Sequence, residues 1–132
     1  MIKNVIFDVA LVIVDWDPTR FSRHVPESEV EALIDSEAFA AINHRTDAGM
    51  SLEQAVAEFD EHHPDLAPTY RAYLEHFEDS VSGPMPGTSE IIAELLERGV
   101  PTFGLSNWAA ENFHVAEEAA PILGRLDDLV VS

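Results

Sequence analysis

The first apolar stretch of the chain predicts a buried strand. Residues 2–14 are mostly aliphatic or aromatic, and Asn4 and Asp8 interrupt the run with polar side chains. A near-continuous run of β-branched and aromatic residues is typical of a strand that is covered on both faces, as in a parallel sheet. An aspartate in such a strand costs free energy unless it is hydrogen-bonded or used in function. Asp8 is therefore a candidate functional residue.

The next part of the chain, residues 15–80, predicts only helices. Asp17 precedes Pro18, an order typical of a helix N-cap followed by a proline in the first turn. Ser51 and Gln54 have the spacing of a capping box, in which each side chain hydrogen-bonds the backbone of the other residue. Apolar residues recur at helical spacing in three segments, residues 27–39, 51–63 and 67–77.

Glycine and proline gather in residues 82–87, the densest turn cluster of the sequence, which predicts a hinge. A predicted helix over residues 88–98 then begins at Thr88 and ends before Gly99. The remaining pattern predicts a strand over residues 100–105, a helix over residues 109–119 and a strand from residue 129. This alternation of strands and helices predicts an α/β fold with a parallel sheet.

The charge of the chain excludes two classes of partner. The sequence contains 25 acidic and 7 basic residues, and its formal net charge is -18. A general nucleic-acid binder needs a basic surface that displaces counterions, and docking to anionic membranes also needs basic residues. We therefore expect neither nucleic acid nor membrane as a partner.

The sequence contains no cysteine, which excludes disulfides, thiolate nucleophiles and zinc–thiolate centres and fits a reducing compartment. No apolar run approaches the length that spans a bilayer. The apolar start of the chain is interrupted and lacks the pattern of a signal peptide. We therefore expect a soluble, cytoplasmic protein.

Polar residues with possible chemical roles lie in one predicted strand and directly after another. Asp8 lies in the first strand, and Ser106 and Asn107 follow the strand over residues 100–105. Active sites of open α/β sheets lie at the carboxyl ends of the strands. There a carboxylate can act as a nucleophile, while a hydroxyl and backbone amides hold an anion. A turn aspartate and a plain helix N-cap are the alternative interpretations.

Several segments, taken in order, resemble a known family. Residues 5–10, Val-Ile-Phe-Asp-Val-Ala, together with residues 14–18 resemble the first motif of the haloacid dehalogenase superfamily. Residues 100–108, which contain Gly-Leu-Ser-Asn-Trp, resemble its second motif. Residues 84–87 match the return from the helical cap of this family, and residues 127–132 are similar to the strand before its third motif. The resemblance covers essentially the whole chain.

The resemblance implies an α/β fold, with a partial Rossmann-like parallel-sheet core and an inserted α-helical cap. The core would comprise residues 1–14 and 84–132, and the mobile cap of four helices would comprise residues 15–83. The implied partner is a small phosphorylated or halogenated substrate.

The resemblance also implies roles for the residues at the strand ends. Asp8 would be the nucleophile that forms a covalent aspartyl intermediate. Ser106 would bind the transferred phosphoryl group or the substrate carboxylate, with Asn107 in support. In a phosphatase of this family, the Asp8 carboxylate and the Ala10 backbone carbonyl would be ligands of Mg²⁺, whereas a dehalogenase needs no metal.

Other conspicuous side chains have a structural interpretation beside the functional one. Trp16 and Trp108 follow the two motif segments and are candidates for substrate contact, although aromatic residues at such positions more often pack between elements. Glu58 and His62 have the spacing of metal ligands, but no third ligand is evident, which favours a solvated helix face. Four aspartates are expected to serve as caps or loop residues: Asp15, Asp17, Asp127 and Asp128. No pairing is predicted for four histidines: His24, His44, His76 and His114.

Three departures from the family pattern bear on activity. Ala10 stands where phosphatases of this family carry a second aspartate as general acid, and Leu11 stands where glycine or asparagine is usual. The sequence ends where the third motif would begin, and Lys3, its only lysine, precedes the nucleophile position. We therefore expect a fragment of a longer hydrolase, a truncated product, or one half completed by another chain.

The absence of later strands would leave the first strand as an open, apolar edge of the sheet. A chain that is stable by itself is then expected to form a homo-oligomer that covers this edge.

The sequence thus predicts a hydrolase of the haloacid dehalogenase type that acts on a small phosphate ester or, as the less favoured substrate, a haloacid. The alternative is a non-catalytic interaction protein with the same fold, favoured by Ala10, Leu11 and the missing lysine and acidic pair. A receiver-type domain is disfavoured, because an insert of about 65 residues after the first strand is far longer than the connections of such domains.

Overall fold

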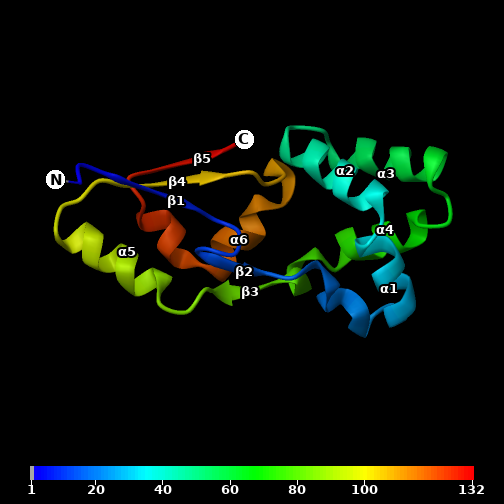
Figure 1. Ribbon diagram of the computed structural model, residues 1–132, viewed down its shortest axis with the longest axis horizontal. Coiled ribbons are helices and arrows are strands. Elements are labelled where there is room, and N and C mark those ends of the chain that lie inside the picture. The colour runs from blue at the N-terminus through cyan, green and yellow to red at the C-terminus, as the bar shows by residue number, and fades with distance from the viewer. Residues whose placement is uncertain (1) are drawn as a thin grey trace. The chain divides into compact units, whose positions relative to one another are not determined.

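The computed structural model describes residues 2–132, which form two compact units (Figure 1). Unit 1 comprises the chain up to Trp16 together with Val81–Ser132, and unit 2 comprises Asp17–Ser80. The sequence placed residues 15–83 in the helical insert, whereas residues 15–16 and 81–83 belong to unit 1, because they form strands there. None of the helices among residues 2–132 is long and apolar enough to cross a membrane.

Unit 1 contains a parallel sheet with the strand order β1-β4-β5. Its strands are β1 (Val5–Asp8), β4 (Thr102–Ser106) and β5 (Asp128–Val131). Asp8 pairs with Leu105, and Ser106 pairs with Val131, so these residues lie at the same carboxyl edge of the sheet. The predicted α/β class with a parallel sheet is confirmed, and β1 lies at an open edge, as the sequence indicates.

The helices of unit 1 cover one face of this sheet (Figure 1). They are α5 (Thr88–Glu97), α6 (Phe113–Ala119) and the short 3₁₀ helices η3 (Ala110–Asn112) and η4 (Pro121–Arg125). Thr102 and Ser106 on this face are buried. On the other face Ile6, Leu105 and Val130 are 63%, 51% and 53% exposed. Each of these three side chains belongs to a different strand, so the apolar surface crosses the whole sheet.

The long first strand predicted over residues 2–14 is wrong. β1 ends at Asp8, and a turn leads into β2 (Val14–Trp16), which pairs antiparallel with β3 (Val81–Pro84). The Val9 carbonyl closes the turn by accepting hydrogen bonds from the backbone N–H groups of Ile13 and Val14, at 2.9 and 3.0 Å. The apolar pattern misleads here, because Val9, Ile13 and Val14 are fully buried although they lie in or beside a turn rather than in one continuous strand.

Unit 2 is helical, as predicted, but its helices differ in detail. The segment predicted as one helix over residues 27–39 divides into two, because the Ser36 hydroxyl donates to the Leu33 carbonyl at 2.6 Å and accepts from the Phe39 N–H at 3.1 Å. The capping box of Ser51 and Gln54 is confirmed. The elements are η1 (Pro18–Arg23), α1 (Glu27–Ile34), α2 (Glu37–Asp47), α3 (Leu52–His62), α4 (Ala67–Glu75) and η2 (Phe77–Ser80).

Aromatic rings form the core of unit 2. Tyr70 stacks on Phe59 with ring centroids 4.2 Å apart, and burial raises the pKa of the Tyr70 hydroxyl to about 12. Tyr73 meets Phe21 and Phe77 edge-on, at centroid distances of 5.6 and 5.7 Å. These ring contacts therefore form the packed interior of the helical unit.

Candidate active site

Asp8 occupies the last position of β1, and its side chain is exposed. Its Oδ1 accepts a hydrogen bond from the Val9 N–H at 2.8 Å, which fixes one carboxylate oxygen. The carboxylate is thus anchored to its own backbone while it remains open to solvent. This arrangement suits a nucleophile at the carboxyl edge of a parallel sheet.

Ser106 ends the neighbouring strand β4, and it is 1% exposed. Its Oγ has no hydrogen-bond partner among residues 2–132. A buried hydroxyl left without a partner costs about 1–3 kcal/mol, so such groups in native proteins call for an explanation. A ligand that accepts or donates a hydrogen bond at this edge would satisfy the Ser106 hydroxyl.

Asn107 follows Ser106 and is exposed. Its Oδ1 accepts from the Ser132 hydroxyl at 3.2 Å, while the Ser132 N–H donates to the Ser106 carbonyl at 2.9 Å. The next helical turn has Ala109 as its N-cap, so neither Ser106 nor Asn107 caps a helix. The plain N-cap interpretation of this pair is therefore wrong.

The structure brings Asp8 and Ser106 to one edge but does not join them by a hydrogen bond within residues 2–132. The partner of Asp8 in the sheet register is Leu105, one residue before Ser106. Successive strand residues point to opposite faces, so a bound group would have to reach both side chains across the edge of the sheet.

The turn after β1 carries the two residues that depart from the family pattern. Leu11 has a φ of 62°, the left-handed region that favours glycine, and its side chain is 55% exposed. Ala10 forms an isolated bridge with Val14, and the Leu11 N–H donates to the Val14 carbonyl at 2.8 Å. Leucine therefore occupies this turn at the cost of backbone strain.

The two tryptophans are placed differently from each other. Trp108 is 5% exposed, its indole N–H donates to Asn112 Oδ1 at 2.9 Å, and its ring meets Phe113 edge-on. This arrangement uses the ring in packing and does not favour substrate contact. Trp16 is half-buried at the end of β2 and pairs with Val81 at a bulge. Its predicted contact with substrate stays a prediction.

Two of the four aspartates that were expected as caps or loop residues, Asp17 and Asp127, take such positions, whereas Asp15 and Asp128 lie in strands β2 and β5. Asp17 caps η1 by accepting from the Thr19 N–H at 2.9 Å. Asp127 accepts from the Thr102 N–H at 2.7 Å and thereby fixes the start of β4. His62 lies 4.0 Å from Glu58 and 3.9 Å from Glu61 on α3.

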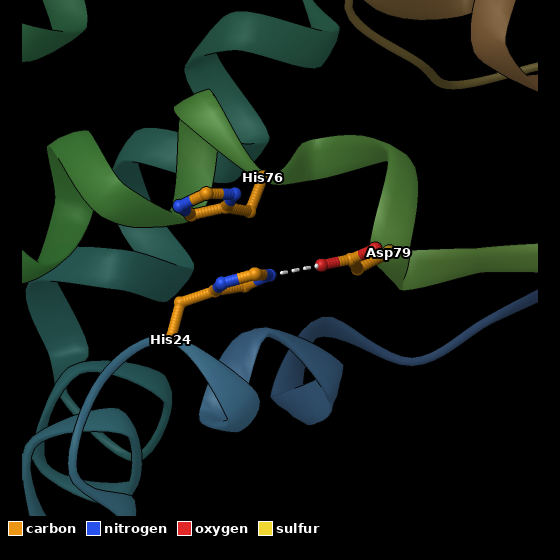
Figure 2. A group of neighbouring side chains, drawn as sticks. All are labelled: His24, His76 and Asp79. Carbon is orange, nitrogen blue, oxygen red and sulfur yellow. Dashed lines mark hydrogen bonds and ion pairs between the residues drawn. The ribbon is translucent and has the colours of Figure 1, made fainter.

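The sequence missed a cluster of two histidines and an aspartate in unit 2 (Figure 2). The rings of His24 and His76 stack with centroids 3.7 Å apart, and His24 Nε2 lies 2.8 Å from Asp79 Oδ2. The sequence made no prediction of this pairing. No local pattern could reveal the cluster, because His24 is far from the other two residues in the chain and only the packing of η1 against η2 joins them.

Two solved proteins illustrate the similarity. L-2-haloacid dehalogenase from Xanthobacter autotrophicus, with chloropropionic acid covalently bound, matches 98% of this chain and 56% of its own, at 17% identity and a TM-score of 0.54. A proposed phosphoglycolate phosphatase from Lactobacillus delbrueckii subsp. bulgaricus matches 97% of this chain and 64% of its own, at 19% identity and a TM-score of 0.55.

The chain thus spans 56% and 64% of the lengths of these two proteins. Neither models of known protein families nor curated proteins match the sequence. The structural matches nevertheless extend over nearly the whole chain and include the parallel sheet and the helical insert. The chain therefore has the haloacid dehalogenase-like fold.

Proposed function

We propose that the chain forms the nucleophile-bearing part of a hydrolase that acts on a small phosphate ester or a small haloacid. The observation that carries the proposal is the position of Asp8 and the unpartnered Ser106 hydroxyl at the carboxyl ends of neighbouring parallel strands. The proteins of similar fold are named as a dehalogenase and a phosphoglycolate phosphatase, which supports this class of reaction.

In this reaction a carboxylate oxygen of Asp8 attacks phosphorus, or the carbon that bears the halogen. A bond forms from this oxygen as the alkoxide or halide departs with the electron pair of the bond that breaks, and water protonates the alkoxide. Water then hydrolyses the aspartyl intermediate and restores the carboxylate. The Ser106 hydroxyl donates to the phosphoryl group or to the carboxylate of the haloacid, and the Val9 N–H orients Asp8 throughout.

Asp8 and Ala10 offer oxygen ligands of the kind that Mg²⁺ binds. Asp8 offers a carboxylate, and within residues 2–132 no backbone N–H donates to the Ala10 carbonyl. Oxygen ligands of this kind suit Mg²⁺, which usually retains waters and takes further ligands from substrate phosphate. The ion would neutralise charge on a phosphoryl group, whereas the haloacid reaction needs no metal.

Ala10 restricts the leaving group. Its methyl group cannot protonate a departing alcohol, and general acid catalysis typically contributes about 10²–10⁴-fold to the rate. Substrates whose leaving groups depart as stable anions are therefore favoured: aryl phosphates, acyl phosphates and halides. We expect the ratio of aryl to alkyl phosphate turnover to fall sharply in an Ala10→Asp variant, because the new carboxyl can protonate the alkoxide.

We predict that Asp8→Asn abolishes turnover of p-nitrophenyl phosphate and 2-chloropropionate, because the amide is a poor nucleophile. Steady-state assays with and without Mg²⁺ make the measurement, in the longest form of the protein that folds. Asp128→Asn is the matched control: it removes another exposed strand carboxylate, which lies at the opposite, amino-terminal end of β5. Unchanged turnover in Asp8→Asn would refute the proposed nucleophile.

A non-catalytic interaction protein is the second candidate. The combination of Ala10 and the strained Leu11 in the turn after β1 favours it, because this turn lacks both the general acid and the usual flexible residue. Magnesium titration separates the two functions. A saturable Mg²⁺ site that Asp8→Asn removes favours the hydrolase, whereas weak binding that is indifferent to Asp8 favours the interaction protein.

A further inference from the structure

The cluster of His24, His76 and Asp79 lies wholly in unit 2 and plays no part in the proposed hydrolysis. One possible ligand atom of each residue lies within 4.8 Å of those of the other two. Figure 2 shows the imidazole rings one above the other, with a nitrogen of His24 facing the Asp79 carboxylate. Three side chains from two separate segments thus converge on one point.

Buried aromatic residues and backbone hydrogen bonds lie close to the three side chains in the chain. Phe21 precedes His24 by one turn of η1, and the His24 N–H donates to the Phe21 carbonyl at 2.9 Å. Tyr73 and Phe77 flank His76, and both rings are buried. The Asp79 N–H donates to the His76 carbonyl at 2.9 Å, which fixes the spacing of these two side chains. The cluster is therefore built on ordered backbone.

The donor set selects a class of metal. Two imidazoles and a carboxylate suit Zn²⁺ and its neighbours among the transition metals, whereas Mg²⁺ and Ca²⁺ favour oxygen ligands. Tetrahedral Zn²⁺ with ligands at about 2.0–2.2 Å requires ligand atoms roughly 3.4 Å apart. The separations here are 2.8 Å between His24 and Asp79 and at most 4.8 Å overall. The stacked rings hold their nitrogen lone pairs in parallel planes, so one imidazole has to rotate out of the stack before both can bind the same ion.

The surroundings leave room for a fourth ligand and favour a cation. The side chains of His24 and Asp79 are 36% and 21% exposed, so water can complete the coordination. His76 lies at the carboxyl end of α4, where the helix dipole favours positive charge. Arg23 Nε lies 4.0 Å from Asp79 Oδ2, but its side chain is 65% exposed and can move away when a metal binds.

We propose that His24, His76 and Asp79 form a binding site for a divalent transition metal, with Zn²⁺ as its test ion. The site joins η1, which follows the start of unit 2 at Asp17, to η2, which ends it at Ser80. Bound metal therefore ties together the two ends of the helical unit and raises its thermal stability.

Calorimetric titration of the purified chain with Zn²⁺ tests the site. We expect one saturable site, and a rise in Tm with Zn²⁺ that equal Mg²⁺ does not produce. Loss of an outer-shell partner alone typically weakens metal binding about 10–100-fold, so His24→Ala and His76→Ala should each weaken it at least about tenfold. Co²⁺ in place of Zn²⁺ should give visible absorption bands that both variants lose.

His62→Ala and His114→Ala are the matched controls. Both remove exposed histidines, and His62 lies 4.0 and 3.9 Å from Glu58 and Glu61, as any imidazole on an acidic surface can. These controls, and Asp8→Asn, should bind Zn²⁺ like the unmodified chain, so failure of the hydrolase proposal leaves this test unaffected. Circular dichroism checks that each variant folds, and Asp79→Asn supplies a third ligand variant. Equal Zn²⁺ affinity in ligand and control variants would overturn the site.

Discussion

The Ser106 hydroxyl should lower the stability of the fold while it strengthens the binding of substrate. Because the buried Oγ has no partner within residues 2–132, its removal should not destabilise the fold. We predict that Ser106→Ala leaves the free energy of unfolding unchanged or raises it by about 1 kcal/mol, since no buried hydroxyl is then left unsatisfied. The same change should raise KM for an active substrate at least about tenfold, the equivalent of roughly 1.4 kcal/mol.

Ser80→Ala is the control for this prediction. Ser80 is as deeply buried, but its hydroxyl donates to the Phe77 carbonyl at 2.6 Å. Its loss should lower the free energy of unfolding by about 1 kcal/mol in denaturant titrations. A comparable loss in Ser106→Ala would mean that the Ser106 hydroxyl is satisfied in the folded chain, and the argument for a ligand there would fail.

Leu11 is strained in the turn after β1. A leucine at φ 62° costs about 1–2 kcal/mol, and its largely exposed side chain offers little burial in return. We predict that Leu11→Asn raises the free energy of unfolding by about 0.5–1 kcal/mol, because asparagine tolerates the left-handed region. Thermal unfolding measures the effect. Val12→Asn, at an adjacent exposed residue outside that region, should show no gain; an equal gain at both positions would contradict strain as the cause.

At this scale the sequence predicted the residues that sit in local patterns. Asp8 and Ser106 were proposed as candidates because Asp8 interrupts an apolar run and Ser106 follows one, and Asp17 and Ser51 were predicted as caps because caps are local. The partners of His24 could not be predicted, because its contacts with His76 and Asp79 arise from the packing of two segments distant in sequence. The left-handed φ of Leu11 could not be predicted either, since the position holds neither glycine nor asparagine, the residues that usually indicate this conformation.

Among the elements, β4 depends on a glycine at its centre. A Cβ on Gly104 would lie 2.5 Å from Leu129 Cδ1 and 3.0 Å from Leu126 Cδ1. We predict that Gly104→Ala lowers the free energy of unfolding by about 1–3 kcal/mol, the usual cost of overpacking. Chemical denaturation measures the change. Gly124→Ala, where a Cβ meets nothing within 4 Å, should be nearly neutral.

The Leu129→Ala background tests the cause of that loss. There the added methyl has room, so Gly104→Ala should cost less than it does in the original chain. An undiminished cost would point to the backbone of β4 rather than to the leucine side chains.

Element types were more predictable than their boundaries. Helices over residues 51–63 and 88–98 agree closely with α3 and α5, because their apolar spacing is local. The capping box of α3 is local as well, whereas α5 has Gly87 as its N-cap and no side-chain cap. The strand predicted over residues 2–14 was wrong, because residues buried in a turn give the same apolar pattern as residues buried in a strand. The turn cluster over residues 82–87 likewise concealed β3, whose pairing with β2 depends on a segment far away in sequence.

For the whole molecule, the uncovered face and open edge of the sheet are the main features. Ile6, Leu105 and Val130 expose apolar surface across the three strands of the parallel sheet, and no strand within residues 2–132 pairs with the outer edge of β1. Exposed apolar strands at an edge promote association. We predict that the isolated chain associates into dimers or larger species, which light scattering at moderate salt would detect.

The double variant Ile6→Lys/Val130→Lys should shift the measured mass towards the monomer, because two charges on the uncovered face oppose association. Ile91→Lys is the control, since Ile91 is 54% exposed but lies on α5 rather than on the sheet. A monomeric unmodified chain, or an equal effect of the control, would disprove association through this face.

The antiparallel pair β2 and β3 allows the helical unit to change in evolution independently of the sheet. The chain leaves unit 1 through β2 and returns to it through the adjacent strand β3. The first and last residues of unit 2 are joined by a hydrogen bond, in which the Asp17 N–H donates to the Ser80 carbonyl at 2.8 Å. A tight turn of two residues could close the same pair as a hairpin. Recombination can therefore lengthen, exchange or delete the helical module without altering the strand order of the sheet, so the module and the sheet are free to diverge at separate rates.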